Sequence, residues 1–201
     1  MTGGVNAMTM MFVALAVTAN LLALGIGVLL VGNATGSARA RAVLFETIAP
    51  WARGLAVTIG ATATFGSLFY SEAAGFAPCQ LCWYQRFCMY PIAAVLAIGW
   101  WRPARISTRW VAFGLAVIGS AIALYHWLVE RVPTLAETTA CSVKTPCSVP
   151  WFTRLGFVTI AWMAFSGFVA IALLLICEWR NDRAAEPTSA TAPARMSEPR
   201  L

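Results

Sequence analysis

The chain has 201 residues, of which 60% are hydrophobic and 11% are charged, and its mean hydropathy is +0.73. Because soluble domains carry about 25% charged residues, this composition excludes an ordinary water-soluble globular protein and indicates a membrane protein. The formal net charge of +6 does not indicate nucleic-acid binding, because the basic residues flank the apolar segments and form no patch interleaved with aromatic side chains.

Five apolar segments are each roughly as long as the 17 to 25 residues that cross a bilayer as a helix. In chain order they are residues 8–31, 55–70, 83–101, 110–128 and 155–179. Lipid does not tolerate unpaired backbone groups, so these segments predict an all-α integral membrane protein with short loops. They leave no room for a second, soluble domain.

The two ends of the chain are interpreted from composition. Residues 1–7 carry no charged side chain and a long apolar run follows, which favours a retained helix over residues 8–32 rather than a cleaved signal peptide. Residues 184–201 are rich in Pro, Ala, Ser and Thr without apolar periodicity. Such a segment buries too little surface to offset its ordering entropy, so we expect residues 181–201 to form a disordered cytoplasmic tail.

Basic residues beside the segment ends predict the orientation of the bundle. They follow the first, third and fifth segments, and they are Arg39, Arg41, Arg53, Arg102, Arg105, Arg109, Arg180 and Arg183. Loops rich in Lys and Arg stay in the cytoplasm. The N-terminus and residues 72–86 and 129–154 are therefore expected to face outward.

Four of the six cysteines fall in the two outward segments, namely Cys79, Cys82, Cys141 and Cys147. The outward face of a bacterial inner membrane is oxidising, so cysteines placed there are either bonded or exchange disulfides. Two loop pairs predict two disulfides. Cys88 and Cys177 fall inside apolar segments and are interpreted as small buried residues that take no part in the chemistry of the two loop pairs.

The inner pair, Cys79 and Cys82, directly precedes the third segment. Its spacing places both sulfurs on one face of a starting helical turn, where the helix N-terminus favours a thiolate. Arg86 follows one turn later and can stabilise that negative charge; the alternative is an arginine that reaches toward the lipid interface. By itself the C-x-x-C pattern also suits metal sites and structural disulfides.

The outer pair, Cys141 and Cys147, encloses five residues including Pro146 in a polar loop. We expect a small, exposed ring that another protein's thiolate can reach. The alternative is a structural staple.

The run from Tyr70 through Pro78-Cys79-Gln80-Leu81-Cys82-Trp83-Tyr84-Gln85-Arg86 to Pro91 resembles the DsbB family, above all its short-loop, BdbC-like members. The resemblance extends through Tyr125-His126 and the Cys141 loop, and it covers roughly residues 51–179. It implies a four-helix membrane bundle over residues 51–180, to which residues 8–32 add an N-terminal helix.

The resemblance also implies an activity. Family members are thiol:quinone oxidoreductases of the bacterial inner membrane, which re-oxidise a DsbA-like, thioredoxin-fold dithiol protein outside the cytoplasm. The electrons go to a membrane quinone, ubiquinone or menaquinone. By resemblance, Cys141 accepts the partner, Cys147 attacks Cys79, Cys82 is the sulfur nearest the quinone, and Arg86 helps to hold the quinone ring.

His126, the only histidine, lies near the outward end of the fourth segment. It is a candidate proton donor in the quinone site, and its alternative is an interfacial side chain bonded to backbone. Glu72 is a weaker candidate of the same kind, whose alternative is a solvated helix end. Trp83 and Tyr84 can stack on a quinone, although aromatic residues gather at membrane interfaces in any case.

Two other functions compete with this prediction. A vitamin K epoxide reductase-like oxidase also couples two cysteine pairs to a quinone, but its pairs follow the opposite order along the chain. A membrane metal-binding or transport protein needs further ligands or intramembrane carboxylates, whereas the apolar segments are nearly free of Asp and Glu.

Overall fold

The computed structural model describes residues 3–101, 106–138, 141 and 145–190. In order, its helices are α1 (Gly3–Ala34), α2 (Ala38–Ala42), the π-helix η1 (Val43–Ile48), α3 (Ala49–Leu68), the π-helix η2 (Phe69–Ala73), α4 (Gln80–Trp101), α5 (Ile106–Val129), α6 (Pro133–Thr138) and α7 (Ile160–Ala190). Within these ranges a single antiparallel bridge, Arg154 with Val158, is the only β pairing.

Five helical stretches of the described chain are long and apolar enough to cross a membrane. They are Gly3–Ala34, Ala38–Ala73, Gln80–Gly99, Thr108–Val129 and Ile160–Arg183. The predicted all-α fold with five spans is confirmed, and the chain is a multi-pass membrane protein.

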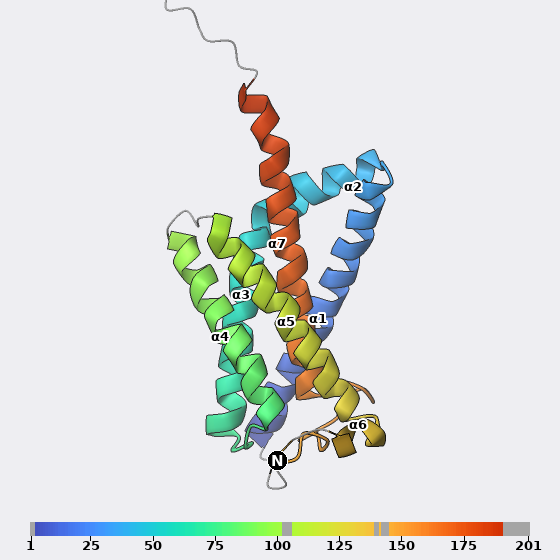
Figure 1. Ribbon diagram of the computed structural model, residues 1–201, viewed down its shortest axis with the longest axis vertical. Helices are drawn as coiled ribbons and strands as arrows, with labels where there is room; N and C mark the ends of the chain where they lie inside the picture. The colour runs from blue at the N-terminus through green and yellow to red at the C-terminus, as the bar shows by residue number, and fades with distance from the viewer. Residues whose placement is uncertain (1–2, 102–105, 139–140, 142–144, 191–201) are drawn as a thin grey trace, which may run out of the picture.

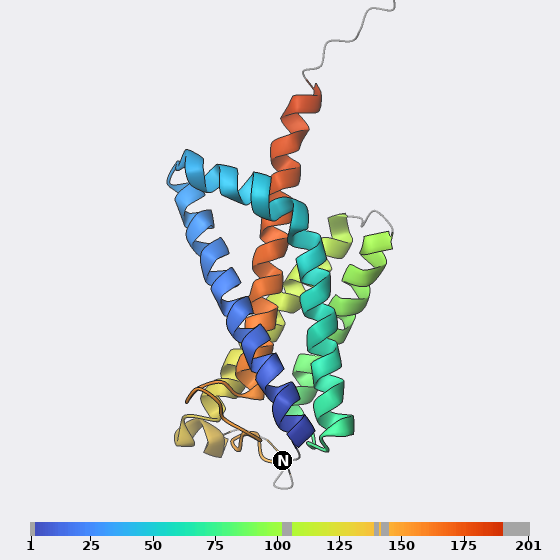
Figure 2. The ribbon, with the colours of Figure 1, turned by 180° about the vertical axis from the view of Figure 1, so that it is seen from behind.

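The long helix α7 lies at the centre of the arrangement. It packs against α1, α3 and α5, while α4 packs between α3 and α5 (Figures 1 and 2). The helices α3, α4, α5 and α7 thus form a four-helix bundle, and α1 joins it from outside through α7. The N-terminus and α6 lie at one end of the molecule and α2 at the other (Figure 1). We call the first the cysteine end, because both cysteine pairs pack there beside Leu135 of α6.

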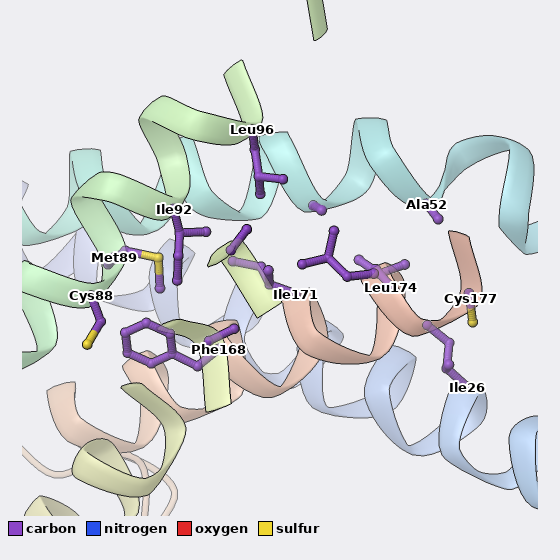
Figure 3. Close-up of a cluster of buried hydrophobic side chains, with 14 of the residues drawn as sticks. Ile26, Ala52, Cys88, Met89, Ile92, Leu96, Phe168, Ile171, Leu174 and Cys177 are labelled. Carbon is purple, nitrogen blue, oxygen red and sulfur yellow. The ribbon is translucent and has the colours of Figure 1, made fainter. Parts of the chain in front are cut away.

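Figure 3 shows the main core, where side chains of α4 and α7 meet halfway along the bundle. Ile92 and Phe168 are completely buried in it. Gly119 of α5 packs directly on Phe168, and a Cβ atom at this position would overlap the aromatic ring. Cys88 and Cys177 both belong to this hydrophobic cluster, as expected for small buried residues that are separate from the two cysteine pairs.

The second span begins earlier than its hydropathy predicts. Gly36, with φ of 88°, turns the chain after α1, and the Ser37 hydroxyl then caps α2 by accepting a hydrogen bond from the Ala40 N–H (3.3 Å). From α2 the chain is helical through η1 into α3. This helical stretch therefore contains charged residues before the apolar segment begins, and an apolar pattern alone does not predict that part of the helix.

The fifth span begins later than predicted, and it ends later. Leu155 and Gly156 both have positive φ, 52° and 76°, so they form a turn next to the Arg154–Val158 bridge, and α7 starts only at Ile160. At the other end α7 continues through Ala190. This differs from the disordered tail expected from residue 181. The segment contains the good helix formers Arg183, Ala184 and Ala185, which directly follow Asn181 and Asp182. Residues 191–201 lie outside the described residues.

An ionic cluster holds the helices together at the end opposite the cysteines. Arg53 of α3 contacts the buried Glu178 of α7 at 2.6 Å, and Arg109 of α5 lies 3.7 Å from the same carboxylate and also pairs with Asp182. Three helices are therefore joined by basic residues that the sequence marks as topology signals.

Candidate active site

The turn before α4 places Cys79 at the helix N-terminus. Gly75, with φ of 69°, lets the chain leave η2, and α4 begins at Gln80. The Cys79 carbonyl accepts the first helical hydrogen bond from the Trp83 N–H (3.1 Å), and its sulfur accepts one from the Cys82 N–H (3.3 Å). Cys79 thus fills the capping position usually held by Ser, Thr or Asp.

The inner pair is present as a dithiol. The two sulfurs lie 2.9 Å apart and are not bonded, whereas a disulfide requires about 2.05 Å. The structure therefore differs from the predicted inner bridge, and the bond in the resting enzyme stays a prediction. In the dithiol form, the hydrogen bond from Cys82 and, to a smaller extent, the contact with His126 lower the pKa of the Cys79 thiol to about 4, outweighing the effect of burial. Cys79 is thus the thiolate of the pair.

His126 of α5 lies beside that sulfur. Its Nε2 atom is 3.6 Å from Cys79 Sγ, and its Nδ1 atom is 3.0 Å from the Gln85 amide nitrogen. An amide nitrogen donates, so Nδ1 is the acceptor and the proton of a neutral ring sits on Nε2, facing Cys79. The ring is 4% exposed, which shields this contact from water.

A buried carboxylate completes this side of the site. Glu130 follows His126 by one turn, and its Oε1 atom lies 3.9 Å from His126 Nε2. Its other oxygen accepts a hydrogen bond from the Thr159 hydroxyl (2.6 Å). Burial raises the pKa of Glu130. Sequence reasoning missed both Glu130 and Gln85, although the spacing of four residues between His126 and Glu130 was a usable signal.

Cys82 faces the other way, into a cavity of about 340 Å³ between α1, α3, α4 and α7. Most of the lining side chains are apolar, and the polar ones include Cys82, Gln85 and Arg86. We call this space the membrane cavity. Its apolar lining, with a thiol and a cation among its polar groups, is chemically suited to an apolar ligand with a polar head.

Arg86 is held in place by α3. Its Nε atom donates to the Ser67 hydroxyl and its Nη2 atom to the Ser67 carbonyl, both at 2.9 Å. The guanidinium also lies 5.1 Å from the centre of the Trp83 ring. Sequence reasoning gave no signal for Ser67, because it is nineteen residues away on another helix.

The outer pair forms the predicted disulfide between Cys141 and Cys147. The expected exposed ring is only half right: Cys141 is partly accessible, but Cys147 is 3% exposed. Cys147 is buried in one hydrophobic cluster with Cys79, Leu81 and Val129. The two pairs, 62 residues apart in sequence between Cys79 and Cys141, are therefore packed together in space.

Several candidates lie away from the membrane cavity. Glu72 is exposed and accepts a hydrogen bond from the Ser71 hydroxyl (3.0 Å). Trp83 and Tyr84 are 48% and 45% exposed. Glu72, Trp83, Tyr84 and His126 are not among the described residues that line the cavity. A role for His126 at the quinone stays a prediction, and its observed contacts are with Cys79, Gln85 and Glu130.

The ligand atoms of Cys79, Cys82 and His126 all lie within 4.8 Å of one another. In the part of the chain that the structure describes, this group has three members, one fewer than a structural zinc site requires and as many protein ligands as a catalytic zinc site has. A thiolate beside an imidazole is equally the arrangement of an activated sulfur nucleophile. Together with an adjacent disulfide, it defines a membrane protein that exchanges disulfides.

Comparison with known proteins identifies the family. The family described as "Disulfide bond formation protein DsbB" matches residues 49–177, and the chain belongs to it. It is therefore a membrane protein-disulfide oxidoreductase, and this membership sets aside the vitamin K epoxide reductase-like and metal-transport alternatives. The matched residues contain both cysteine pairs and leave out α1.

Relatives in bacteria carry names of the same kind. "Probable disulfide formation protein C" of Halalkalibacterium halodurans is 37% identical over 120 residues, which cover 58% of this chain and 87% of that protein. "Disulfide bond formation protein C" of Bacillus subtilis is 34% identical over 121 residues, 60% of this chain and 86% of that protein. "Probable disulfide formation protein C 2" of Bacillus cereus is 35% identical over 139 residues, 69% and 96% of the two chains. No solved structure matches the chain.

Proposed function

We propose that the chain is a thiol:quinone oxidoreductase of the bacterial inner membrane. It re-oxidises a DsbA-like, thioredoxin-fold dithiol protein outside the cytoplasm and delivers the electrons to ubiquinone or menaquinone. One observation carries the proposal: the two cysteine pairs share a buried cluster, and Cys82 opens from it onto the membrane cavity. A route for electrons therefore runs from the outward loop to the lipid.

Unequal burial of the outer pair supports the first step. A partner thiolate attacks the accessible Cys141 sulfur, the Cys141–Cys147 bond breaks, and a mixed disulfide forms. The electron pair of the broken bond leaves with Cys147 as a thiolate. Since Cys147 is buried beside Cys79, the released thiolate is already next to its target.

The inner pair then receives the electrons. With the inner disulfide formed, the Cys147 thiolate attacks Cys79, and the bond between Cys79 and Cys82 breaks to release a Cys82 thiolate at the cavity. The partner's second thiolate next displaces Cys141, which attacks Cys147 and restores the outer disulfide. Cys79 leaves as a thiolate. The products are an oxidised partner, an outer disulfide between Cys141 and Cys147, and an inner dithiol.

The residues around the inner pair suit the return step. A quinone bound in the membrane cavity would accept the two electrons of the inner pair together with two protons. Arg86, fixed by Ser67 at the edge of the cavity, places a permanent positive charge where negative charge on oxygen needs stabilising. On the other side, His126 holds the proton at Nε2 toward Cys79.

The proposed orientation follows the charges. Arg53 and Arg109 lie at the end opposite the cysteines, and arginine-rich ends remain cytoplasmic. The cysteine end then faces the oxidising side of the membrane, where a secreted dithiol partner is found.

The test is to purify the full chain in detergent, identify its bound quinone and follow reduction of added quinone by a reduced thioredoxin-fold protein. We expect turnover in the wild type and none in Cys82→Ser. Cys88→Ser is the matched control, because Cys88 lies on the same helix in the hydrophobic core, and it should retain activity. Quinone-dependent turnover near the wild-type level in Cys82→Ser would refute the proposal.

A further inference from the structure

The first helix, α1, lies outside the residues that match the family. It nevertheless makes side-chain hydrogen bonds to the rest of the protein at three positions along its length. Arg154 donates to Asn6 Oδ1 (3.0 Å), the Tyr70 hydroxyl lies 3.4 Å from Thr9 Oγ1, and Asn20 donates to the Ser166 hydroxyl (2.8 Å). These side-chain contacts reach the loop before α7, η2 and α7 itself. A helix that served only as a lipid anchor would not need them.

One face of α1 lines the membrane cavity. The lining residues recur with helical spacing, and they are Phe12, Leu15, Ala16, Ala19 and Leu22, with Thr18 beside them. The lining residues of α1 include the small Ala16 and Ala19, and those of α3 include the small Ala63 and Gly66. Small residues therefore occur on both of these walls of the cavity.

The cavity is elongated along these helices. On α3 its lining runs from Ser67, which holds Arg86, to Leu55. Twelve residues of helix correspond to about 18 Å at 1.5 Å per residue. Figure 2 shows α1 and α3 close together at the cysteine end and diverging toward α2. Phe12 narrows the near end, because its ring lies 3.1 Å from the position of a Cβ atom at Gly66.

We propose that α1 is the wall of a channel for the polyprenyl tail of the quinone, with the quinone head at Cys82 and Arg86. This inference rests on the proposed function. A mostly apolar space that starts at the Cys82 sulfur and the fixed Arg86 cation, and continues along α3 as far as Leu55, matches a molecule with a polar ring and a long hydrocarbon tail. The additional helix thereby belongs to the binding site.

The first test uses bulk on the two faces of α1. Ala19→Phe adds a ring to the half-buried cavity face, and Ala14→Phe adds the same ring to the exposed face. Each variant is assayed with a long-tailed quinone and with a tail-less quinone of the same head. We expect Ala19→Phe to raise KM for the long-tailed quinone about ten-fold. The KM of Ala19→Phe for the tail-less quinone, and the KM of Ala14→Phe for either quinone, should stay within about two-fold of the wild-type value.

The control reactions separate the two proposals. Turnover of the tail-less quinone by the wild type reports on the oxidoreductase activity alone. If the wild type turns over neither quinone, both the proposed function and the channel are refuted. Suppose that the wild type turns over both quinones normally. If Ala19→Phe then leaves both KM values unchanged, or raises both equally, only the channel is overturned.

A second test does not depend on activity. A quinone with a photoreactive group on its tail is irradiated with the full chain, and the labelled peptide is identified by mass spectrometry. We expect labelling within residues 12–22, reduced by excess long-tailed quinone and by Ala19→Phe. Labelling confined to other helices would overturn the inference. So would equal competition by phospholipid, because that result makes the space a lipid groove.

Discussion

The thiolate assigned to Cys79 makes a measurable prediction about the reduced enzyme. An ordinary cysteine with a pKa of about 8.5 is only about 3% thiolate at pH 7, whereas Cys79, with a pKa of about 4, is almost fully ionised. The sign follows from the direction of the shift. Because the pKa is lowered, the thiolate is present above pH 4 and is lost only as the pH falls through that value.

The contacts give the expected effect of removing each donor. The Cys82 side chain lies 2.9 Å from Cys79 Sγ and is the largest cause of the lowered pKa, and His126 contributes less from 3.6 Å. A hydrogen bond to a charged group is worth about 1.5–3 kcal/mol, and one pKa unit corresponds to about 1.4 kcal/mol. Cys82→Ala should therefore raise the Cys79 pKa by about one to two units. Cys82→Ser keeps a donor and should change it less.

The assay is the ultraviolet absorbance of the thiolate, titrated from neutral to acid pH in a chain whose Cys141 and Cys147 are replaced by Ser. Subtracting the same chain with Cys79→Ala isolates the sulfur of interest. Absorbance is preferred to alkylation rate, because Cys79 is 6% exposed and because nucleophilicity falls as the pKa falls. A midpoint near that of a free cysteine, or identical midpoints for Cys82→Ala and Cys82→Ser, would refute the assignment.

Three further predictions concern the quinone, the partner and the core. Arg86→Met should raise the KM for quinone about ten-fold to a hundred-fold, through loss of one charge-assisted contact, and an unchanged KM would return Arg86 to the role of an interface anchor. Cys147→Ser should form a reductant-sensitive adduct at Cys141 with a partner that lacks its second cysteine and whose remaining sulfur carries an aromatic thiol, because the Cys141 thiolate attacks that mixed disulfide and the aromatic thiolate leaves. Non-reducing gels test this, and the assignment fails if Cys141→Ser accumulates the same band. Gly119→Ala should lower stability by about 1–3 kcal/mol because the new methyl overlaps a buried aromatic ring. Gly114→Ala, which meets open space in the same helix, is the control, and equal melting temperatures would contradict the packing.

Local patterns in the sequence were enough for the five spans and the outer disulfide. An apolar run of sufficient length specifies a span by itself, and the outer pair is separated by only six positions. The start of α7 was missed, because Leu155 and Phe157 continue the apolar run although Leu155 has positive φ. Hydropathy does not report backbone conformation.

The contacts made by the residues around the inner cysteine pair could not be predicted from the sequence. Gln85 meets His126 across forty-one positions, and Ser67 meets Arg86 across nineteen. Each contact depends on how two helices are rotated against each other, which single-helix periodicity leaves open. The burial of Cys147 depends likewise on how the outer loop folds onto α4 and α5. The cavity wall formed by α1 needed all four surrounding helices in place.

The unequal burial of the outer disulfide also bears on which thiols the enzyme accepts. A small thiol that attacks Cys141 releases a Cys147 thiolate enclosed in the protein, and that thiolate can return to Cys141 and expel the intruder. A protein dithiol that docks over the loop stays in place long enough for Cys147 to turn toward Cys79. Under the proposed function, the enzyme then discriminates between thiols by how long each stays bound at the loop, and free low-molecular-weight thiols do not pass their electrons to the membrane quinone.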